Sequence, residues 1–171
     1  VAILSRGYKS RSIPFWQKIW LRINNRSIEV PPRVVSDGQQ LLLDSHTAGD
    51  EPYMLASNLP DVAVVVDKDR VKSGKYAIRV LGCDTLILDD GFQYLKLGNR
   101  LDIALVDRTN PYGGGHLLPR GLLREPMKNI KRAGFIFITK CDEQGAPELK
   151  NQLREMNPTA EISECRHRAK Y

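Results

Sequence analysis

The chain has 171 residues and a formal net charge of +6, from 26 Lys and Arg against 20 Asp and Glu, and 42% of it is hydrophobic. This length fits one α/β domain or a large part of a two-domain protein, and the positive charge favours anionic partners without choosing among phosphates, nucleic acid and acidic membranes. The 3 cysteines are too widely spaced for a disulfide framework or a zinc site, and no apolar run in the sequence approaches the ~18 residues of a membrane-spanning helix.

The sequence predicts an alternation of strands and helices. In chain order we expect a strand at 1–4, a helix at 14–26, a loop or irregular insertion at 28–49, a helix at 50–59, a strand at 62–66, a helix at 69–82, strands at 85–88, 103–106 and 135–139, and a helix at 146–157. The strand runs are continuously apolar, which is typical of strands buried on both faces. This rhythm predicts an α/β fold with a mostly parallel sheet, helices on both faces and ligands at the carboxyl ends of the strands.

The segment 14–26, "PFWQKIWLRINNR", predicts an amphipathic helix. Its apolar residues, Trp16 and Trp20 among them, fall on one helical face, and basic residues lie on the flank and back. Tryptophan with Lys and Arg on a short helix is typical of a helix that lies at a membrane interface. The alternative is a helix that packs against the protein core, and the pattern leaves both open.

Residues 85–91, "TLILDDG", end an apolar strand on two adjacent carboxylates. This is the layout of a Walker-B element, which holds Mg²⁺ beside nucleotide phosphates. Asp89 and Asp90 would give a hard cation one direct oxygen ligand and one through water. The alternative is a simple turn at the strand end, with an aspartate capping the next segment.

Two further motifs carry polar groups that suit phosphate chemistry. In "GDEP" (49–52), Asp50 and Glu51 open a predicted helix, either as ordinary N-capping or as carboxylates placed to accept a proton or hold a metal through water. In 110–126, three successive glycines precede Arg120 and Arg124, which predicts either a phosphate clamp or a flexible surface loop.

Five motifs in a fixed order resemble those of the tetraacyldisaccharide 4′-kinases, the lipid A 4′-kinases of Gram-negative envelope synthesis. They are "ILSRGY" (3–8), "GDEP" (49–52), "DDGFQ" (89–93), "LLPRGLLREP" (117–126) and "TK" (139–140). The resemblance covers residues 1–142, and the ordered set is far more specific than any one motif. It implies a P-loop NTPase-like kinase fold that transfers the γ-phosphoryl group of ATP to the 4′-hydroxyl of a lipid-anchored disaccharide 1-phosphate.

The resemblance implies roles for residues at the matching positions. They are Asp50 as the catalytic acid–base group, Asp89, Asp90, Glu51 and Glu125 at Mg²⁺, and Gln93, Arg124 and Arg70 at the nucleotide. Phosphoryl transfer needs positioning and charge neutralisation more than covalent chemistry, and these residue types supply both.

Departures from the family pattern bear on the extent of the chain. No G-x-x-x-x-G-K-[ST] phosphate loop is present in the sequence, and the histidine that pairs with the "GDEP" aspartate in the family lies beyond it. We therefore expect residues 1–171 to be the central part of a P-loop kinase domain, incomplete at the N-terminus and inactive alone, with 142–171 starting a C-terminal portion. Tyr94 stands where the family usually has His, and Arg120 and Leu122 where it has a small residue and Pro.

The implied partners are ATP, Mg²⁺, a lipid A disaccharide precursor and the cytoplasmic face of the bacterial inner membrane, contacted peripherally. Nucleic acid is not expected, because the sequence has no recognised DNA-binding motif and no base-stacking signature. The alternative, which the net charge of +6 and the missing phosphate loop favour, is a non-catalytic module that binds anionic lipid or phosphate. No oligomeric state is predicted.

Overall fold

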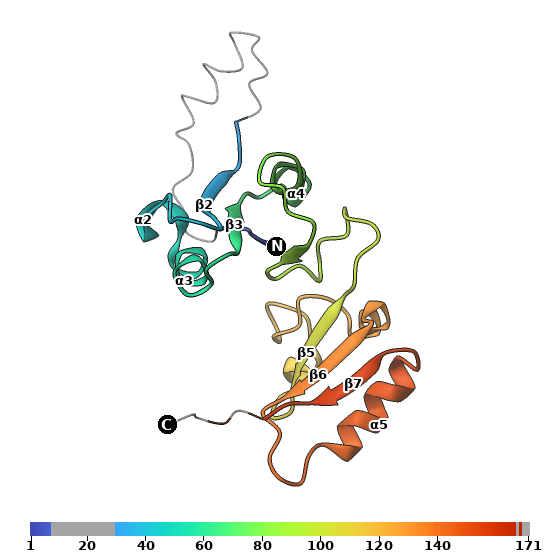
Figure 1. Cartoon of the computed structure of the whole chain (residues 1–171). Coiled ribbons are helices and arrows are strands. Elements are labelled where there is room, and N and C mark those ends of the chain that lie inside the picture. The colour runs from blue at the N-terminus through green and yellow to red at the C-terminus, as the bar shows by residue number, and fades with distance from the viewer. Residues whose placement is uncertain (8–29, 167, 169–171) are drawn as a thin grey trace. The chain divides into compact units, whose positions relative to one another are not determined.

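A computed structural model describes residues 1–7, 30–166 and 168 of the chain. The fold divides after Gly91 into unit 1, Val1–Gly91, and unit 2, Phe92–Tyr171. In Figure 1 unit 1 runs from blue to green and unit 2 from yellow to red. The predicted amphipathic helix at 14–26 lies outside the described residues.

Unit 1 is built on a four-stranded sheet in the order β2-β3-β1-β4. Its strands are β1 (Ala2–Ser5), β2 (Arg33–Asp37), β3 (Ala63–Val66) and β4 (Leu86–Leu88). The pairs β1–β3 and β1–β4 are parallel, whereas β2 runs antiparallel to β3 at the edge of the sheet. The three parallel strands therefore end at one common edge, the arrangement predicted from the sequence.

Helices cover both faces of the unit 1 sheet. On one face, Leu4 and Val65 pack with Ala77 of α4 (Arg70–Arg79). On the other face, a second cluster joins the sheet to α2 (Ser45–Ala48) and α3 (Asp50–Asn58). Every residue of β1 and β3 is buried, as expected for strands covered on both sides.

One part of unit 1 differs from the sequence prediction. Residues 28–49 were expected to form a loop or irregular insertion, but they contain β2 and α2. Within β2 the buried residues are Val35 and Ser36, and two residues are too few to distinguish a strand from a loop in the sequence. A register shift between Val34 and Ser36 also breaks the alternation of side chains between the two faces of the strand. Pairing with β3 makes this segment a strand, and pairing is not visible in the local sequence.

Unit 2 is a three-stranded parallel sheet in the order β5-β6-β7. Its elements are β5 (Ile103–Asp107), the 3-10 helices η1 (Gly113–Gly115) and η2 (Met127–Arg132), β6 (Phe135–Thr139), α5 (Pro147–Met156) and β7 (Glu161–Glu164). Helix α5 crosses from β6 to β7 and lies beside the sheet in Figure 1. Leu149 and Leu153 on its inner face pack against Ile136 and Ile138, and this cluster is the core of unit 2.

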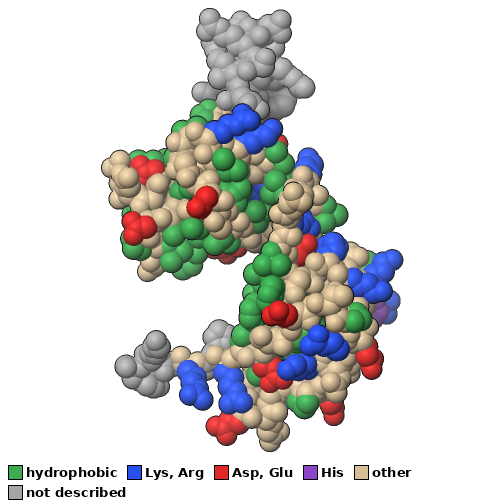
Figure 2. Space-filling view, turned by 45° about the vertical axis from the view of Figure 1, so that its right-hand side comes forward, with side chains coloured by type: hydrophobic (Ala, Val, Ile, Leu, Met, Phe, Trp, Pro, Cys, Tyr) green, Lys and Arg blue, Asp and Glu red, His purple; other side chains and the backbone are tan. Residues whose placement is uncertain are grey.

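The predicted burial of every strand on both faces is wrong outside β1 and β3. Strands β5 and β6 alternate, with Ala104 and Val106 buried and with Ile103 and Leu105 exposed by 51% and 73% of their surface. Ile87 in β4 is likewise half-exposed. Among the described elements, no helix packs on this face of the unit 2 sheet, and hydrophobic side chains are visible on the surface of both units (Figure 2).

All five predicted strands and the three predicted helices at 50–59, 69–82 and 146–157 are present, so the α/β class is confirmed. Within the part of the chain that the structure describes, no helix combines the length and apolar character that crossing a bilayer requires.

Candidate functional site

The carboxyl edge of the parallel strands in unit 1 gathers polar side chains. The backbone N–H of Asp89 donates to Leu4 O (3.1 Å), and that of Asp67 donates to Ser5 O (3.1 Å). The hydroxyl of Ser5 donates to the carboxylate of Asp89 at 3.4 Å. These hydrogen bonds join the carboxyl ends of β1, β3 and β4. Asp89 follows β4, and Asp67 follows β3.

The two adjacent acids form a tight turn at the end of β4. Asp90 has a φ of 53°, a left-handed conformation that is uncommon for residues other than glycine, aspartate and asparagine. A Cβ at Gly91 would lie 2.5 Å from the Cβ of Leu88, so only glycine fits after the acids. Asp89 is partly buried and Asp90 is exposed. The turn interpretation and the cation interpretation are therefore compatible, because the turn itself presents two carboxylates in succession.

Helix α3 presents a second pair of acids. Asp50 and Glu51 occupy its first turn and are exposed. The N-cap is Gly49, with a φ of 96° and no side-chain cap, so the prediction that Asp50 itself caps the helix is wrong. Only residues 59–62 join α3 to β3, and the helix packs on β3, so it runs back along that strand. Its N-terminus therefore lies toward the carboxyl edge of the parallel strands.

Helix α4 starts at the same edge, directly after β3. Asp69 caps it by accepting from the backbone N–H groups of Val71 (3.0 Å) and Lys72 (3.3 Å). Arg70, the first residue of the helix, is only 5% exposed. Lys72 forms an ion pair with Asp67, the acid that follows β3. At this edge, therefore, Lys72 is paired with an acid and the Arg70 side chain is buried.

The oxygen groups at this edge fit Mg²⁺ when the ion arrives with a nucleotide. Mg²⁺ in nucleotide sites is commonly held by one or two carboxylates, several waters and the phosphates themselves. Asp89, Asp90 and the Ser5 hydroxyl supply hard oxygen donors of that kind. Among the described residues, no three His, Cys, Asp or Glu side chains gather into a group that could hold a metal ion by itself.

In unit 2 the predicted site residues form a separate hydrogen-bonded cluster around Glu125. One carboxylate oxygen of Glu125 accepts from Arg132 (2.9 Å) and from Gln93 Nε2 (3.3 Å). The other accepts from Arg132 (2.9 Å) and from Asn129 Nδ2 (2.7 Å). The guanidinium of Arg132 also donates to Phe92 O at 3.1 Å and lies 4.5 Å from the centre of the Phe92 ring.

The environment keeps Glu125 ionised. Burial raises the pKa of Glu125, but hydrogen bonds from Asn129 and Arg132 and the positive charge of Arg132 lower it more, so the pKa lies below its usual value. Arg124, its neighbour in "LREP", is exposed.

This cluster does not lie where the sequence led us to expect ligands. Arg132 is three residues before the start of β6, and the N–H of Gly134 donates to Asp102 O just before β5. The cluster around Glu125 is therefore at the amino edge of the unit 2 sheet. The structure brings Gln93 and Glu125 together at the edge opposite the strand ends.

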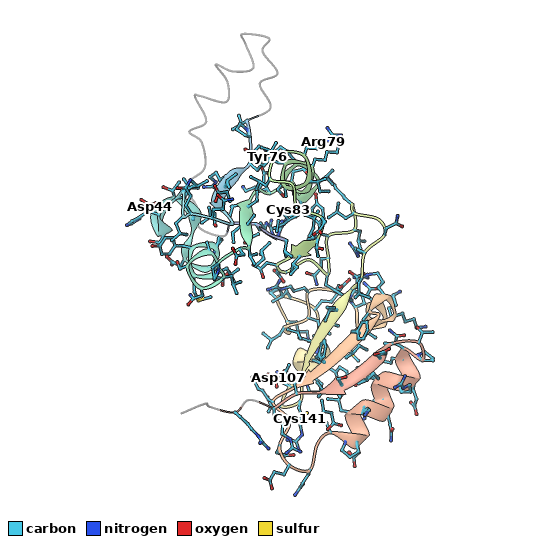
Figure 3. The ribbon with its side chains drawn as sticks, viewed as in Figure 1. Asp44, Tyr76, Arg79, Cys83, Asp107 and Cys141 are labelled. Carbon is cyan, nitrogen blue, oxygen red and sulfur yellow. The ribbon has the colours of Figure 1, made fainter. Side chains whose placement is uncertain are left out.

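The carboxyl edge of unit 2 is instead neutralised by its own ion pairs. Asp107 at the end of β5 pairs with Lys140, and Arg108 pairs with Asp142 at 2.8 Å. Hydrogen bonds from Lys140 and Thr109 lower the pKa of Asp107 to about 2. Figure 3 shows Asp107 and Cys141 at this edge. The charged residues that follow β5 are therefore paired with those that follow β6.

The glycine-rich loop is folded on itself rather than extended. Leu122 N–H donates to Gly113 O (2.9 Å), and Leu123 N–H donates to His116 O (3.2 Å). The close backbone approach was predicted for the three successive glycines. A Cβ at Gly113 would lie 2.8 Å from the Cβ of Leu122, so this glycine approaches the chain itself, whereas a Cβ at Gly114 or Gly115 would meet nothing within 4 Å. The loop is an ordered support for the "LREP" segment.

Sequence reasoning missed Ser5, Asn129 and Arg132. Ser5 lies in the quoted motif "ILSRGY", and its place beside Asp89 follows from the parallel pairing of β1 with β4. Glu125, Asn129 and Arg132 have the spacing i, i+4, i+7, which places three side chains on one helical face and could have been noticed. The contact of Arg132 with Phe92, across 40 residues, has no local signal.

Comparison with known proteins gives one consistent family. The family model "LpxK: Tetraacyldisaccharide-1-P 4'-kinase" matches residues 1–170. A tetraacyldisaccharide 4'-kinase from Anaeromyxobacter sp. (strain K) is 42% identical over 156 residues, which are 91% of this chain and 36% of that protein. One from Halothermothrix orenii is 36% identical over 168 residues, 96% of this chain and 40% of that protein.

A solved structure agrees with the sequence matches. A crystal structure of LpxK from Aquifex aeolicus, described as an "apo" form in complex with ATP, is 39% identical with a TM-score of 0.65. The match covers 80% of this chain and 38% of that one, and it confirms the predicted fold class. The chain therefore spans less than half the length of these relatives.

Proposed function

The chain belongs to the tetraacyldisaccharide-1-P 4'-kinase family, and from this premise we propose that the protein transfers the γ-phosphoryl group of ATP to the 4′-hydroxyl of a lipid A disaccharide 1-phosphate. The observation that carries the proposal is the match over residues 1–170, together with the two acids held at the carboxyl edge of unit 1. This is the edge where open α/β sheets bind their ligands.

We propose that Asp89 and Asp90 hold Mg²⁺ and that Glu51 supports the same site. When bound, Mg²⁺ neutralises charge on the nucleotide phosphates. The Ser5 hydroxyl, which donates to Asp89, orients that carboxylate. The glycine after the acids keeps the turn tight, so both carboxylates stay at the strand end.

Asp50 is our proposed acid–base group, which accepts the proton of the sugar hydroxyl as it attacks the γ-phosphorus. Its exposed place in the first turn of α3 leaves the carboxylate accessible to a substrate. Arg70, Gln93 and Arg124 are proposed to contact the nucleotide, because guanidinium and amide groups match phosphate oxygens in charge and geometry. Glu125 remains a predicted metal ligand, although four hydrogen bonds already reach its carboxylate.

We further propose that the protein works at the cytoplasmic face of the inner membrane, as a peripheral protein. A substrate with four acyl chains is anchored in a bilayer, so an enzyme acting on its sugar must approach the surface. The net charge of +6 and the segment 14–26 support the proposal. Flotation of the complete gene product with vesicles should depend on anionic lipid and weaken with salt; equal flotation with neutral vesicles would contradict it.

The test of the kinase proposal is a rate measurement on the complete product of the gene that encodes this chain. We expect Asp50→Ala and Asp90→Ala each to lower the rate of 4′-phosphorylation at least about a hundredfold, because each removes a charged group that acts in the transition state. Asp84→Ala is the matched control, since Asp84 is an exposed acid at the opposite end of β4. Wild-type turnover in both site variants would remove the site assignment.

A further inference from the structure

Arg132 connects the two segments of unit 2 that carry proposed site residues. Its guanidinium donates to both carboxylate oxygens of Glu125 at 2.9 Å and to Phe92 O at 3.1 Å. The sequence neighbours of these two acceptors are Arg124 and Gln93, both proposed to contact the nucleotide. A single side chain from η2 therefore fixes the backbone beside one site residue and the side chain beside the other.

The contacts around Arg132 are those of a rigid clamp. The carboxylate of Glu125 has about four lone-pair positions, and the four hydrogen bonds from Arg132, Asn129 and Gln93 fill them. The Phe92 ring packs against the guanidinium with its centre 4.5 Å away. Arg132 and Glu125 side chains are 27% and 20% exposed, so water competes with these bonds less than at an open surface.

We propose that Arg132 is a positioning residue for the phosphoryl transfer, which holds Gln93 and Arg124 in place through Phe92 and Glu125. The inference rests on the proposed kinase function. Arg132 acts through these residues rather than on ATP or the lipid. Its hydrogen bonds to both oxygens of Glu125 and to Phe92 O all come from Nη2, and its Nε is buried with no hydrogen-bond partner among the described residues. Its effect on the rate comes from the geometry of the residues it holds, and small displacements of positioned groups are costly in catalysis.

Arginine suits this position and lysine does not. The guanidinium is planar, so its Nη2 can share its two hydrogens among the Glu125 carboxylate and Phe92 O while the plane packs against the Phe92 ring. An ammonium keeps the positive charge but has no planar group to pack against the Phe92 ring. Arg132→Lys therefore separates the charge of Arg132 from its geometry.

The test compares Arg132→Lys with Arg108→Lys in the complete gene product. Arg108 also forms an ion pair in unit 2, at 2.8 Å to Asp142, and its side chain is 32% exposed, but it lies at the carboxyl edge away from the cluster. We expect Arg132→Lys to lower kcat by about tenfold or more and to raise the KM for ATP–Mg²⁺ by about fivefold. We expect Arg108→Lys to stay within about twofold in both, with the two melting temperatures within about 4 °C of each other.

The rise in KM separates positioning from a loss of folded protein. A purely structural defect lowers the amount of active enzyme and with it the apparent kcat, but leaves KM unchanged. The double variant Glu125→Gln/Arg132→Lys should lose less activity than the product of the two single losses, because both changes disturb the contact between Glu125 and Arg132. Multiplicative losses, or an unchanged KM in Arg132→Lys, would overturn the proposal.

A second measurement is independent of kinase activity. Hydrogen exchange should speed up in the peptide that contains Phe92 and Gln93 in Arg132→Lys, and should match wild type in Arg108→Lys. If the wild-type gene product shows no 4′-kinase activity, the proposed function fails and the role of Arg132 in the reaction fails with it. If the wild type is active but exchange and KM are both unchanged in Arg132→Lys, the clamp alone is rejected and the kinase function stands.

Discussion

The two units carry the same pattern, an acid after an apolar parallel strand, but use it differently. In unit 1, Asp89 follows β4 and accepts a hydrogen bond from the hydroxyl of Ser5. In unit 2, Asp107 follows β5 and pairs with the ammonium of Lys140 on the neighbouring strand end. A neutral partner leaves the acid its charge to offer a cation, whereas a cationic partner neutralises it. Whether the acid at a strand end can bind a cation therefore depends on the charge of the group that contacts it from the neighbouring strand.

The units also differ in the edge that carries the proposed site residues. Unit 1 holds Asp50, Arg70 and the acids of "DDG" toward the carboxyl edge of its parallel strands. Unit 2 holds Gln93 and Glu125 at the amino edge of its sheet, where the Glu125 carboxylate accepts from both Gln93 and Arg132. The proposed site residues of unit 1 therefore follow the general rule for open α/β sheets, whereas those of unit 2 lie at the opposite edge of their own sheet.

The sharpest test of this comparison is the pair Asp89→Asn and Asp107→Asn in the complete gene product. We expect Asp89→Asn to lower the 4′-phosphorylation rate about a hundredfold, because it removes a charge next to the phosphates. Asp107→Asn should leave the rate within about threefold, since its charge is already neutralised by Lys140 and such exposed pairs contribute little.

The two substitutions are isosteric, so each serves as the packing control for the other. Initial rates at saturating ATP and Mg²⁺ would measure the effect. Equal losses in the two variants would mean that both strand ends face the substrate and that the comparison of the two units is mistaken.

Much of the fold was predictable from the sequence, for a physical reason. Strands that are buried on both faces, such as β1 and β3, must be apolar. The helices α3, α4 and α5 carry their own start signals in Pro52, Asp69 and Pro147. These signals are local. The "DDG" turn was also visible, because its acids and its glycine are adjacent in the chain.

The elements that were missed depend on distant partners. Strand β2 is paired antiparallel with β3, and β7 contains one buried residue, Ile162, so neither has a strong pattern of its own. A continuous apolar run predicted that β5 is buried on both faces, but the side chain of Leu105 in this strand is exposed. The contacts of Arg132 cross 40 residues to Phe92 and could be found only from the fold.

Stability gives a second way to separate the units. Asn157 is 2% exposed; its amide donates to Ile130 O and Ala133 O at 2.9 Å, and its oxygen accepts from Thr159 and Ala160. We expect Asn157→Ala to destabilise unit 2 by about 2 kcal/mol, because buried polar groups lose their partners. Urea unfolding followed by hydrogen exchange should show faster exchange in β6 and β7.

Exchange in β1 and β3 of unit 1 should stay unchanged in Asn157→Ala if the units unfold separately. Asn151→Ala, an exposed substitution on α5, is the control and should change stability by less than about 0.5 kcal/mol. Equal acceleration of exchange in both units would show that they unfold as one.

The smallest expected effect concerns pH and the clamp of unit 2. Hydrogen bonds from Asn129 and Arg132 outweigh burial and hold the pKa of Glu125 below its usual value of 4.5. A carboxylate whose pKa is lowered on folding stabilises the protein fully above that usual value and loses this contribution as the pH falls through the folded pKa. The melting temperature of wild type should therefore exceed that of Glu125→Gln most at neutral pH, and the gap should narrow as the pH falls below the usual pKa of Glu125 and through its lowered folded pKa.

Salt gives the control for this titration, because the pair of Glu125 with Arg132 is partly exposed and its charge interaction is screened. Raising NaCl to about 1 M should shrink the neutral-pH gap between wild type and Glu125→Gln. Asp107 should not contribute to the pH dependence of this gap, since its pKa of about 2 keeps it ionised through this range in both proteins. A gap that stays constant from neutral to acid pH would mean that Glu125 contributes by shape alone, and the charge of Arg132 would then be dispensable to the clamp.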